Sequence, residues 1–392
     1  GGHRHERLQD LQRTEHQEQQ GEDLGRRQGG RRRGHIRDRL YALAPNTPSS
    51  AILVALVIGD QSGINLKQWQ TLTQTGVMHL MSISGLHITM IAGLMAGLAA
   101  LAWRRSRWCL TIPARQIAII VGLSSALAYS LLAGFAVPTQ RTFYMLLVIA
   151  IGFWQSQRPP MPLILAWGLT ITLIIDPWGI LNPGVWLSYS AVGVMVLAAS
   201  GTRGKTPKWY NALRVQWAVS LGGIPLLLFW FAQTSNASPL GNAIAVPLVS
   251  FIITPLALLA AAIPIDAISH TFLHWGASLL DTLMQYLDWL AAQPYAVRNQ
   301  ASPPLWMLLL MGAGIILCLL PRIAVVRIIG LLWCLPALTY TPPKIALGAA
   351  HISVFDVGQG LSVLVQTQTH NLLYDTGASW KQDKDTGNQI LV

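Results

Sequence analysis

The apolar segment 76–97 most constrains what this chain can fold into. It is long and apolar enough to enter a lipid bilayer, but its first half also carries polar and small residues, namely His79, Ser82, Ser84, Gly85 and His87. Polar groups that persist in hydrocarbon usually face a protein interior or a water-filled cavity. The segment therefore predicts part of a polar path through a membrane. The alternative is a core helix that hydrogen-bonds its own polar groups.

Two glycines occur later in the same segment. Gly93 and Gly97 are four residues apart, and a pair of small residues at this spacing lets two helix backbones approach closely inside a membrane. We therefore expect Gly93 and Gly97 to form a helix-packing surface.

The composition is that of a polytopic membrane protein. Hydrophobic residues make up 52% of the chain and charged residues only 11%, whereas about a quarter of the residues in soluble domains are charged. The apolar runs predict an all-α membrane protein with about nine or ten transmembrane helices. The expected spans are 83–103, 116–136, 139–155, 161–176, 184–200, 215–233, 240–263, 304–320 and 323–340, with 271–292 as a further candidate.

Two of the expected spans have unusual polar or helix-breaking residues. Asn242 lies in a run that also contains Pro247 and Pro255. Proline kinks a helix, and the carbonyls that it frees need a partner or a wet cavity. Pro138 and Arg141 lie at the start of another expected span. An arginine there must extend its charged group to the membrane–water interface, pair with a group of opposite charge, or line a polar path. These residues favour a polar path, although ordinary kinking within a bundle remains the alternative.

The N-terminal part differs from the rest of the chain. Residues 1–40 are rich in arginine, contain all four glutamates of the chain and lack apolar periodicity. This predicts a disordered, low-complexity segment, and the abrupt change is also compatible with an out-of-frame reading. Residues 41–82 have a mixed pattern that favours an amphipathic, interfacial lead-in to the membrane domain at 83–345.

The pattern changes again in residues 346–392. Alternating apolar residues predict short strands near 352–357, 361–367 and 371–375. So short a segment cannot enclose a core of its own. Its histidines and carboxylates do not have the spacing of a metal site, so we expect no metal and no cofactor in this chain.

These residues together resemble the ComEC family of bacterial competence proteins. The stretch 76–88 is very similar to the family signature, and 55–60, 182–190 and 242–247 look like further family motifs. Residues 355–360 and 374–377 resemble the opening of the family's metallo-β-lactamase-like α/β domain. The residues that match it are Asp356, Gly358, Gly360, Asp375 and Gly377.

The resemblance implies an inner-membrane channel that passes single-stranded DNA into the cytoplasm during natural transformation. Its partners would be single-stranded DNA, the lipid bilayer and other competence proteins, such as a DNA receptor and a cytoplasmic motor. The expected polar path comprises His79, Ser84, Gly85, His87, Pro138, Arg141 and Asn242. Two alternatives are a secondary transporter of a small solute and a membrane-anchored metallo-hydrolase whose catalytic part is missing.

The chain departs from the family pattern at three places. Leu361 stands where many members have aspartate, and residues 1–40 cannot form the oligonucleotide-binding-type domain that usually precedes the channel. The histidine-rich metal cluster of the hydrolase domain would lie beyond Val392. We therefore expect a truncated or fragmentary member without catalytic residues of its own.

Overall fold

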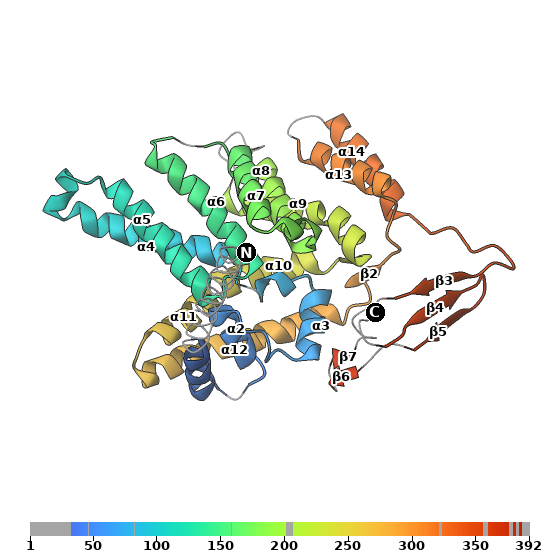
Figure 1. Cartoon of the computed structure of the whole chain (residues 1–392), viewed down its shortest axis with the longest axis horizontal. Coiled ribbons are helices and arrows are strands. Elements are labelled where there is room, and N and C mark those ends of the chain that lie inside the picture. Colours follow the sequence, from blue (N-terminus) through green and yellow to red (C-terminus); the bar gives the residue numbers. More distant parts are fainter. Residues whose placement is uncertain are drawn as a thin grey trace, which may run out of the picture.

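The structure, a computed structural model, is mostly helical with a small sheet near the C-terminus (Figure 1). It describes residues 33–45, 47–81, 83–157, 159–200, 207–320, 324–355, 360–375, 379–381 and 384–385. Two helical hairpins extend from a more compact central part, and the strands lie at the far end from the α4–α5 hairpin.

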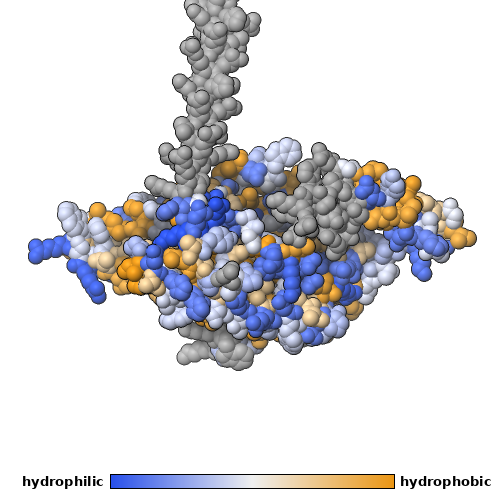
Figure 2. All heavy atoms as spheres, turned by 90° about the horizontal axis from the view of Figure 1, so that it is seen from below, coloured by the Kyte–Doolittle hydropathy of each residue, from blue (hydrophilic) through white to orange (hydrophobic). Residues whose placement is uncertain are grey.

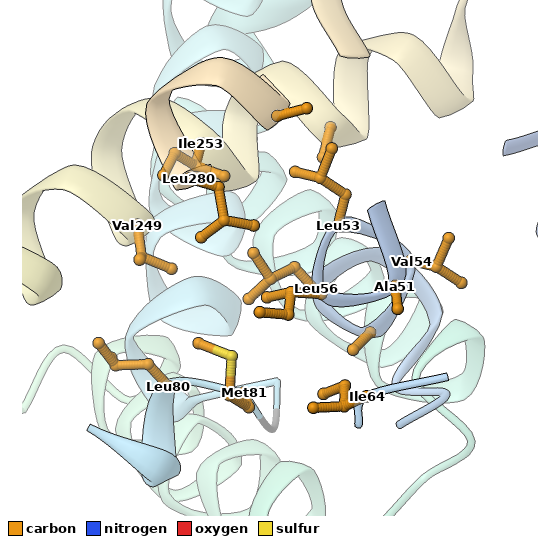
Figure 3. Close-up of a cluster of buried hydrophobic side chains, with 14 of the residues drawn as sticks. Ala51, Leu53, Val54, Leu56, Ile64, Leu80, Met81, Val249, Ile253 and Leu280 are labelled. Carbon is orange, nitrogen blue, oxygen red and sulfur yellow. The ribbon is translucent and has the colours of Figure 1, made fainter. Parts of the chain in front are cut away.

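Helix α2 (Ser50–Ile58) lies at the centre of the largest hydrophobic core, and all nine of its residues are buried. Its side chains are apolar on every side, and such a helix is stable only when it is enclosed completely. Helices α11 (Thr254–Ala262) and α12 (Asp266–Ala291) and the short turn η1 (Met78–Leu80) enclose it. Figure 3 shows Leu56 of α2 among side chains from these elements.

The helix at 33–43 and helix α3 complete this core. Arg39 donates hydrogen bonds to the carbonyl oxygens of Ala261 and Ile263 and to Asp266, which ties the end of α11 to the start of α12. The disorder expected for 1–40 is therefore wrong for 33–40, because these residues are helical and Leu40 is buried. The remaining residues of that segment, 1–32, lie outside the described part.

The lead-in at 41–82 also differs from its prediction. Helix α3 (Leu66–Gln74) is amphipathic, begins at a capping box of Asn65 and Gln68, and packs on α12. Helix α2, however, is enclosed by protein and does not lie at an interface. Its uniform apolar surface explains this difference, because it has no polar face to turn toward water.

The longer helices form hairpins and neighbouring pairs. Helices α4 (Gly85–Arg104) and α5 (Ala114–Leu132) form one hairpin, with η2 (Arg107–Leu110) at its tip. Helices α13 (Leu305–Leu319) and α14 (Ala324–Leu338) form another. Between them lie α6 (Val137–Trp154), α7 (Met161–Ile175), η3 (Pro177–Leu181), α8 (Pro183–Ser200) and α9 (Lys208–Phe231). Figure 2 shows hydrophilic residues at the tip of the α4–α5 hairpin, at the left, and a mixed hydrophilic and hydrophobic surface elsewhere on this face.

One long apolar helix is interrupted in its middle. Helices α10 (Ser238–Leu248) and α11 are joined by a π-helical segment, η4 (Val249–Ile253). Pro247 precedes this segment and Pro255 follows it. A proline has no backbone N–H, and π turns often occur where the regular ladder of hydrogen bonds is broken. The irregularity predicted in this span is thus present as a π turn, but the helix continues through it from Ser238 to Ala262.

The strands form three small antiparallel sheets. Strand β1 (Gln233–Ser235) pairs with β2 (Val297–Asn299) between the helices, and β6 (Ser379–Lys381) pairs with β7 (Lys384–Asp385). The three strands predicted near the C-terminus are confirmed as β3 (His351–Val354), β4 (Val363–Gln366) and β5 (Asn371–Tyr374), in that order in one sheet. Their metallo-β-lactamase-like identity remains a prediction.

Five helical segments of the described residues are long and apolar enough to cross a membrane: Met78–Arg104, Ala114–Leu132, Pro183–Ser200, Leu213–Phe231 and Ser238–Ala262. Met161–Ile175, Leu305–Leu319 and Val325–Leu338 are shorter apolar helices. The membrane class is thus supported, but the expected nine or ten spans are not reached. Helix α12, which covers the further candidate 271–292, is outside the first group. It turns one apolar face to the core, including Leu273, Leu280 and Leu287.

Among the described residues, nothing packs against Gly93 or Gly97, which we expected to form a helix-packing surface. A Cβ atom at either position would have nothing within 4 Å. Helix α4 instead meets α5 through Ala92 and Ala96, because a Cβ atom at Gly122 would lie 3.1 Å from the carbonyl oxygen of Ala92 and 3.1 Å from the Cβ of Ala96. The contact uses small residues at the expected spacing, but on the neighbouring face of the helix.

Gly241 of α10, by contrast, lies at a tight contact, and it provides a test of this packing. A Cβ atom there would lie 2.9 Å from the carbonyl oxygen of Thr75. Gly241→Ala should therefore lower the thermal unfolding midpoint of the detergent-purified protein. Gly93→Ala is the matched control, because both changes improve helix propensity by about 1 kcal/mol. Equal midpoints for the two variants would contradict the described packing of α10.

Candidate functional site

The segment 76–97 is not one continuous helix. It contains the η1 turn, an extended residue at Ser84 (φ −79°, ψ 157°), and helix α4, which begins at Gly85. The polar residues of the segment therefore lie at this break and in the first turn of α4, which contains Gly85 and His87. We call this break, together with the residues that contact it from α6, α10 and α11, the polar junction.

His87 is the most deeply buried polar residue of the signature. Its side chain is 0% exposed, and its Nε2 atom lies 3.5 Å from the Oγ1 of Thr254 at the start of α11. Its Nδ1 atom is buried without a partner, and so is the Oγ of Ser84. His87 thus contacts the helix that continues from the π-helical segment, so the two breaks lie against each other.

Gly85 brings the start of α4 against α6. A Cβ atom at Gly85 would lie 2.6 Å from the Oγ1 of Thr142, which donates a hydrogen bond to the carbonyl oxygen of Pro138 at 3.2 Å. Pro138 stands in the first turn of α6, where its missing N–H costs nothing. Gly85 and Pro138 therefore set the close approach of the two helix starts.

Asn242 and His79 meet at one backbone carbonyl. The Nδ2 of Asn242 donates to the carbonyl oxygen of Gly76 at 3.3 Å and to the Oγ of Ser238 at 2.9 Å. The Nδ1 of His79 lies 3.2 Å from the same Gly76 oxygen. Asn242 is buried and its Oδ1 has no partner, whereas His79 is exposed.

Arg141 lies one residue before Thr142 on α6 but faces another neighbour. It is 4% exposed, and its guanidinium lies beside Gly184 in the first turn of α8. Its Nε is buried, and no described residue forms a hydrogen bond or ion pair with its side chain. Of the seven expected path residues, the structure thus gathers His79, Ser84, Gly85, His87, Pro138 and Asn242 at the polar junction and places Arg141 beside it.

The sequence analysis missed three residues of this region. Thr254 contacts His87, and Ser250 and Ser130 are 0% exposed with an unpartnered Oγ atom. The spacing of Pro247 and Pro255 was the signal for Ser250 and Thr254, because the helix between two prolines is where polar side chains can replace lost backbone bonds. No sequence signal marks Ser130.

The described residues of the C-terminal segment form no comparable site. Gly360 and Asp375 both have positive φ angles, 103° and 60°, at the ends of the strand connections. Asp356, Gly358 and Gly377 lie outside the described residues. In the described part, no group of three or more His, Cys, Asp or Glu side chains could hold a metal ion.

Comparison with known proteins identifies related chains. The family model described as "Competence protein" matches residues 56–324. Competence protein ComA of Neisseria gonorrhoeae is 38% identical over 83% of this chain, which corresponds to 46% of that protein. Recombination protein 2 of Haemophilus influenzae is 28% identical over 87% of this chain and 48% of its own length. ComE operon protein 3 of Bacillus subtilis is 26% identical over 92% of this chain and 47% of its own length.

The chain therefore spans about half the length of the curated relatives that it matches. No solved structure matches it. The family match covers the polar junction, the π-helical segment and Arg141. On this match, which extends over more than half of the sequence, the chain belongs to the ComEC family of competence proteins.

Proposed function

We propose that this chain passes single-stranded DNA across the bacterial inner membrane during natural transformation. The observation that carries the proposal is the set of buried polar atoms without partners on Ser84, His87, Arg141 and Asn242. An unpaired buried polar group costs about 1–3 kcal/mol. Polar groups kept at such a cost among membrane helices usually mark the path of a substrate or ion.

The chemistry of these groups suits a substrate that is read without regard to sequence. A DNA strand offers phosphates that a guanidinium can attract, and bases and sugars that accept or donate hydrogen bonds to imidazole, hydroxyl and amide groups. The helix break before α4 and the π-helical segment lie against each other at His87 and Thr254. Broken helices of this kind are typical of transport proteins, which also keeps a secondary transporter of a small solute as the second candidate.

The partners follow from the same proposal. The strand and the bilayer are its immediate partners, and a DNA receptor and a cytoplasmic motor would act before and after the channel. The strands β3–β5 would form the opening of a metallo-β-lactamase-like domain. The relatives named as competence proteins support a role in DNA uptake.

The direct test uses liposomes that contain the purified chain. A short fluorescent single-stranded oligonucleotide is added outside, and the fraction that becomes protected from added nuclease is measured. We expect protection of the single strand but not of a duplex of the same length. Selective passage of a small labelled solute without passage of DNA would favour the secondary transporter instead.

His87→Leu tests the polar junction in the same liposomes. Leucine fills a similar volume but has no polar atom, so the passage rate should fall by about ten-fold or more. His270→Leu is the matched control, because His270 is exposed on α12 and should leave the rate unchanged. Equal rates for the two variants would show that His87 only packs. If His87→Leu does not insert into the liposomes, the passage rate is measured for His87→Gln, which keeps a polar side chain. A rate equal to that of His270→Leu would then show that His87 only packs.

We further propose that this chain binds no catalytic metal and cleaves no nucleic acid. A catalytic zinc site needs three or more protein ligands and an open position for water. His351 and His370, the histidines of the C-terminal strands, are both exposed. The dialysed protein should hold substoichiometric zinc and manganese and should leave single-stranded DNA intact. Stoichiometric metal together with cleavage would favour the metallo-hydrolase.

A further inference from the structure

Arg141 differs from other arginines that the structure places against helix ends. Arg33 donates to the carbonyl oxygen of Ile58, and Arg39 donates to carbonyl oxygens at the end of α11. Arg141 is more deeply buried than either, at 4% exposure, and makes no hydrogen bond or ion pair with a described residue. A guanidinium stays charged in proteins, and a buried charge without a partner is strongly unfavourable. No described residue therefore supplies a negative charge to this guanidinium.

The guanidinium lies at the N-terminus of an 18-residue helix. A Cβ atom at Gly184, in the first turn of α8, would lie 3.7 Å from Nη1 and 3.9 Å from Nη2 of Arg141. The N-terminus of an α-helix carries a partial positive charge and favours anions. The guanidinium and the positive end of the helix dipole thus lie next to each other, and the Oδ1 of Asn182 caps the Gly184 N–H at 2.8 Å beside them.

The neighbouring polar groups do not neutralise this charge. The hydroxyl group of Tyr189 in α8 is 3.0 Å from the Oγ1 of Thr172 and forms no hydrogen bond with Arg141 in the described part. Asp176, which precedes η3, lies 3.3 Å from the Cβ position of Gly179 and forms no ion pair with Arg141. The Oδ1 of Asn182, 3.1 Å from the Cβ position of Gly184, carries no formal charge, so no described residue neutralises Arg141.

We infer that Arg141 and the first turn of α8 form a binding site for a phosphodiester. A guanidinium matches two oxygens of one phosphate group, and the dipole at a helix N-terminus adds a favourable field for an anion. The backbone of single-stranded DNA is the source that the position favours, because Thr142 beside Arg141 packs on Gly85 at the polar junction. This preference rests on the proposed function. A phospholipid headgroup carries the same chemical group.

The test compares Arg141→Gln with the wild-type chain in dodecyl maltoside, a detergent without phosphate. Binding of a short fluorescent single-stranded oligonucleotide is measured by anisotropy at several salt concentrations. The variant should bind about ten-fold more weakly, and the slope of log K against log salt should fall by about 0.7. Arg107→Gln is the control, because it removes the same charge from an exposed position at the tip of the α4–α5 hairpin.

A second measurement separates the two sources of phosphodiester. Phosphatidylglycerol is added to the detergent-purified protein, and the lipid retained is counted by mass spectrometry. If Arg141→Gln keeps its oligonucleotide affinity but loses the retained lipid, the site exists and takes the lipid headgroup. If neither measurement differs from the wild type, the phosphodiester site is overturned.

Folding of the variants is checked by thermal unfolding. Removing an unpaired buried charge should raise the midpoint in the absence of ligand. A lowered midpoint would mean that Arg141→Gln is misfolded. The binding measurement is then made with Arg141→Lys, which keeps the charge but loses the planar guanidinium. An affinity for the oligonucleotide below that of the wild type would support the site, and an unchanged affinity would overturn it. If the wild-type chain passes DNA in liposomes but Arg141→Gln binds the oligonucleotide and the lipid as the wild type does, this inference is overturned and the proposed function is not. Arg141-dependent binding without DNA passage would overturn the proposed function alone.

Discussion

The complete burial of α2 is the constraint on which the rest of the structure depends. A helix that is apolar on every side has no face to turn toward water, so other elements must enclose it. The η1 turn, the π-helical segment and α12 do so, and Tyr129 of α5 and Arg33 donate to the carbonyl oxygens of Leu56 and Ile58 at its end. Because η1 and the π-helical segment both pack on α2, the two helix breaks are held close together.

The polar junction follows from this arrangement. Hydrophobic contacts around α2 place the start of α4, the middle of the α10–α11 span and the loop at Gly76 within reach of each other. The polar side chains at these breaks then meet one another, but they are too few to satisfy all of their donors and acceptors. A junction that is fixed by apolar packing can keep unpaired polar atoms, because the core supplies the stability that these atoms reduce.

The arginines illustrate how tertiary contacts decide the role of one residue type. Arg39 donates hydrogen bonds to the carbonyl oxygens of Ala261 and Ile263 at the end of α11 and so connects this helix to the helix at 33–43. Arg141 lies at the opposite kind of helix end, the start of α8, where the backbone N–H groups of Gly184 and Val185 donate to Asn182 and offer no acceptor to a guanidinium. The same chemistry that stabilises one helix end therefore leaves a site for an anion at the other.

Local sequence by itself determined several features of this protein. Hydropathy determined the membrane class, prolines 247 and 255 determined where a span breaks, and alternation determined strands β3–β5. Only the tertiary structure decided which small residues pack, since Ala92 and not Gly93 faces α5. It also decided that His87 contacts Thr254 and that no described residue forms a hydrogen bond or ion pair with Arg141. Periodicity describes how one segment presents its residues, whereas a contact depends on which distant segment the enclosed core brings to it.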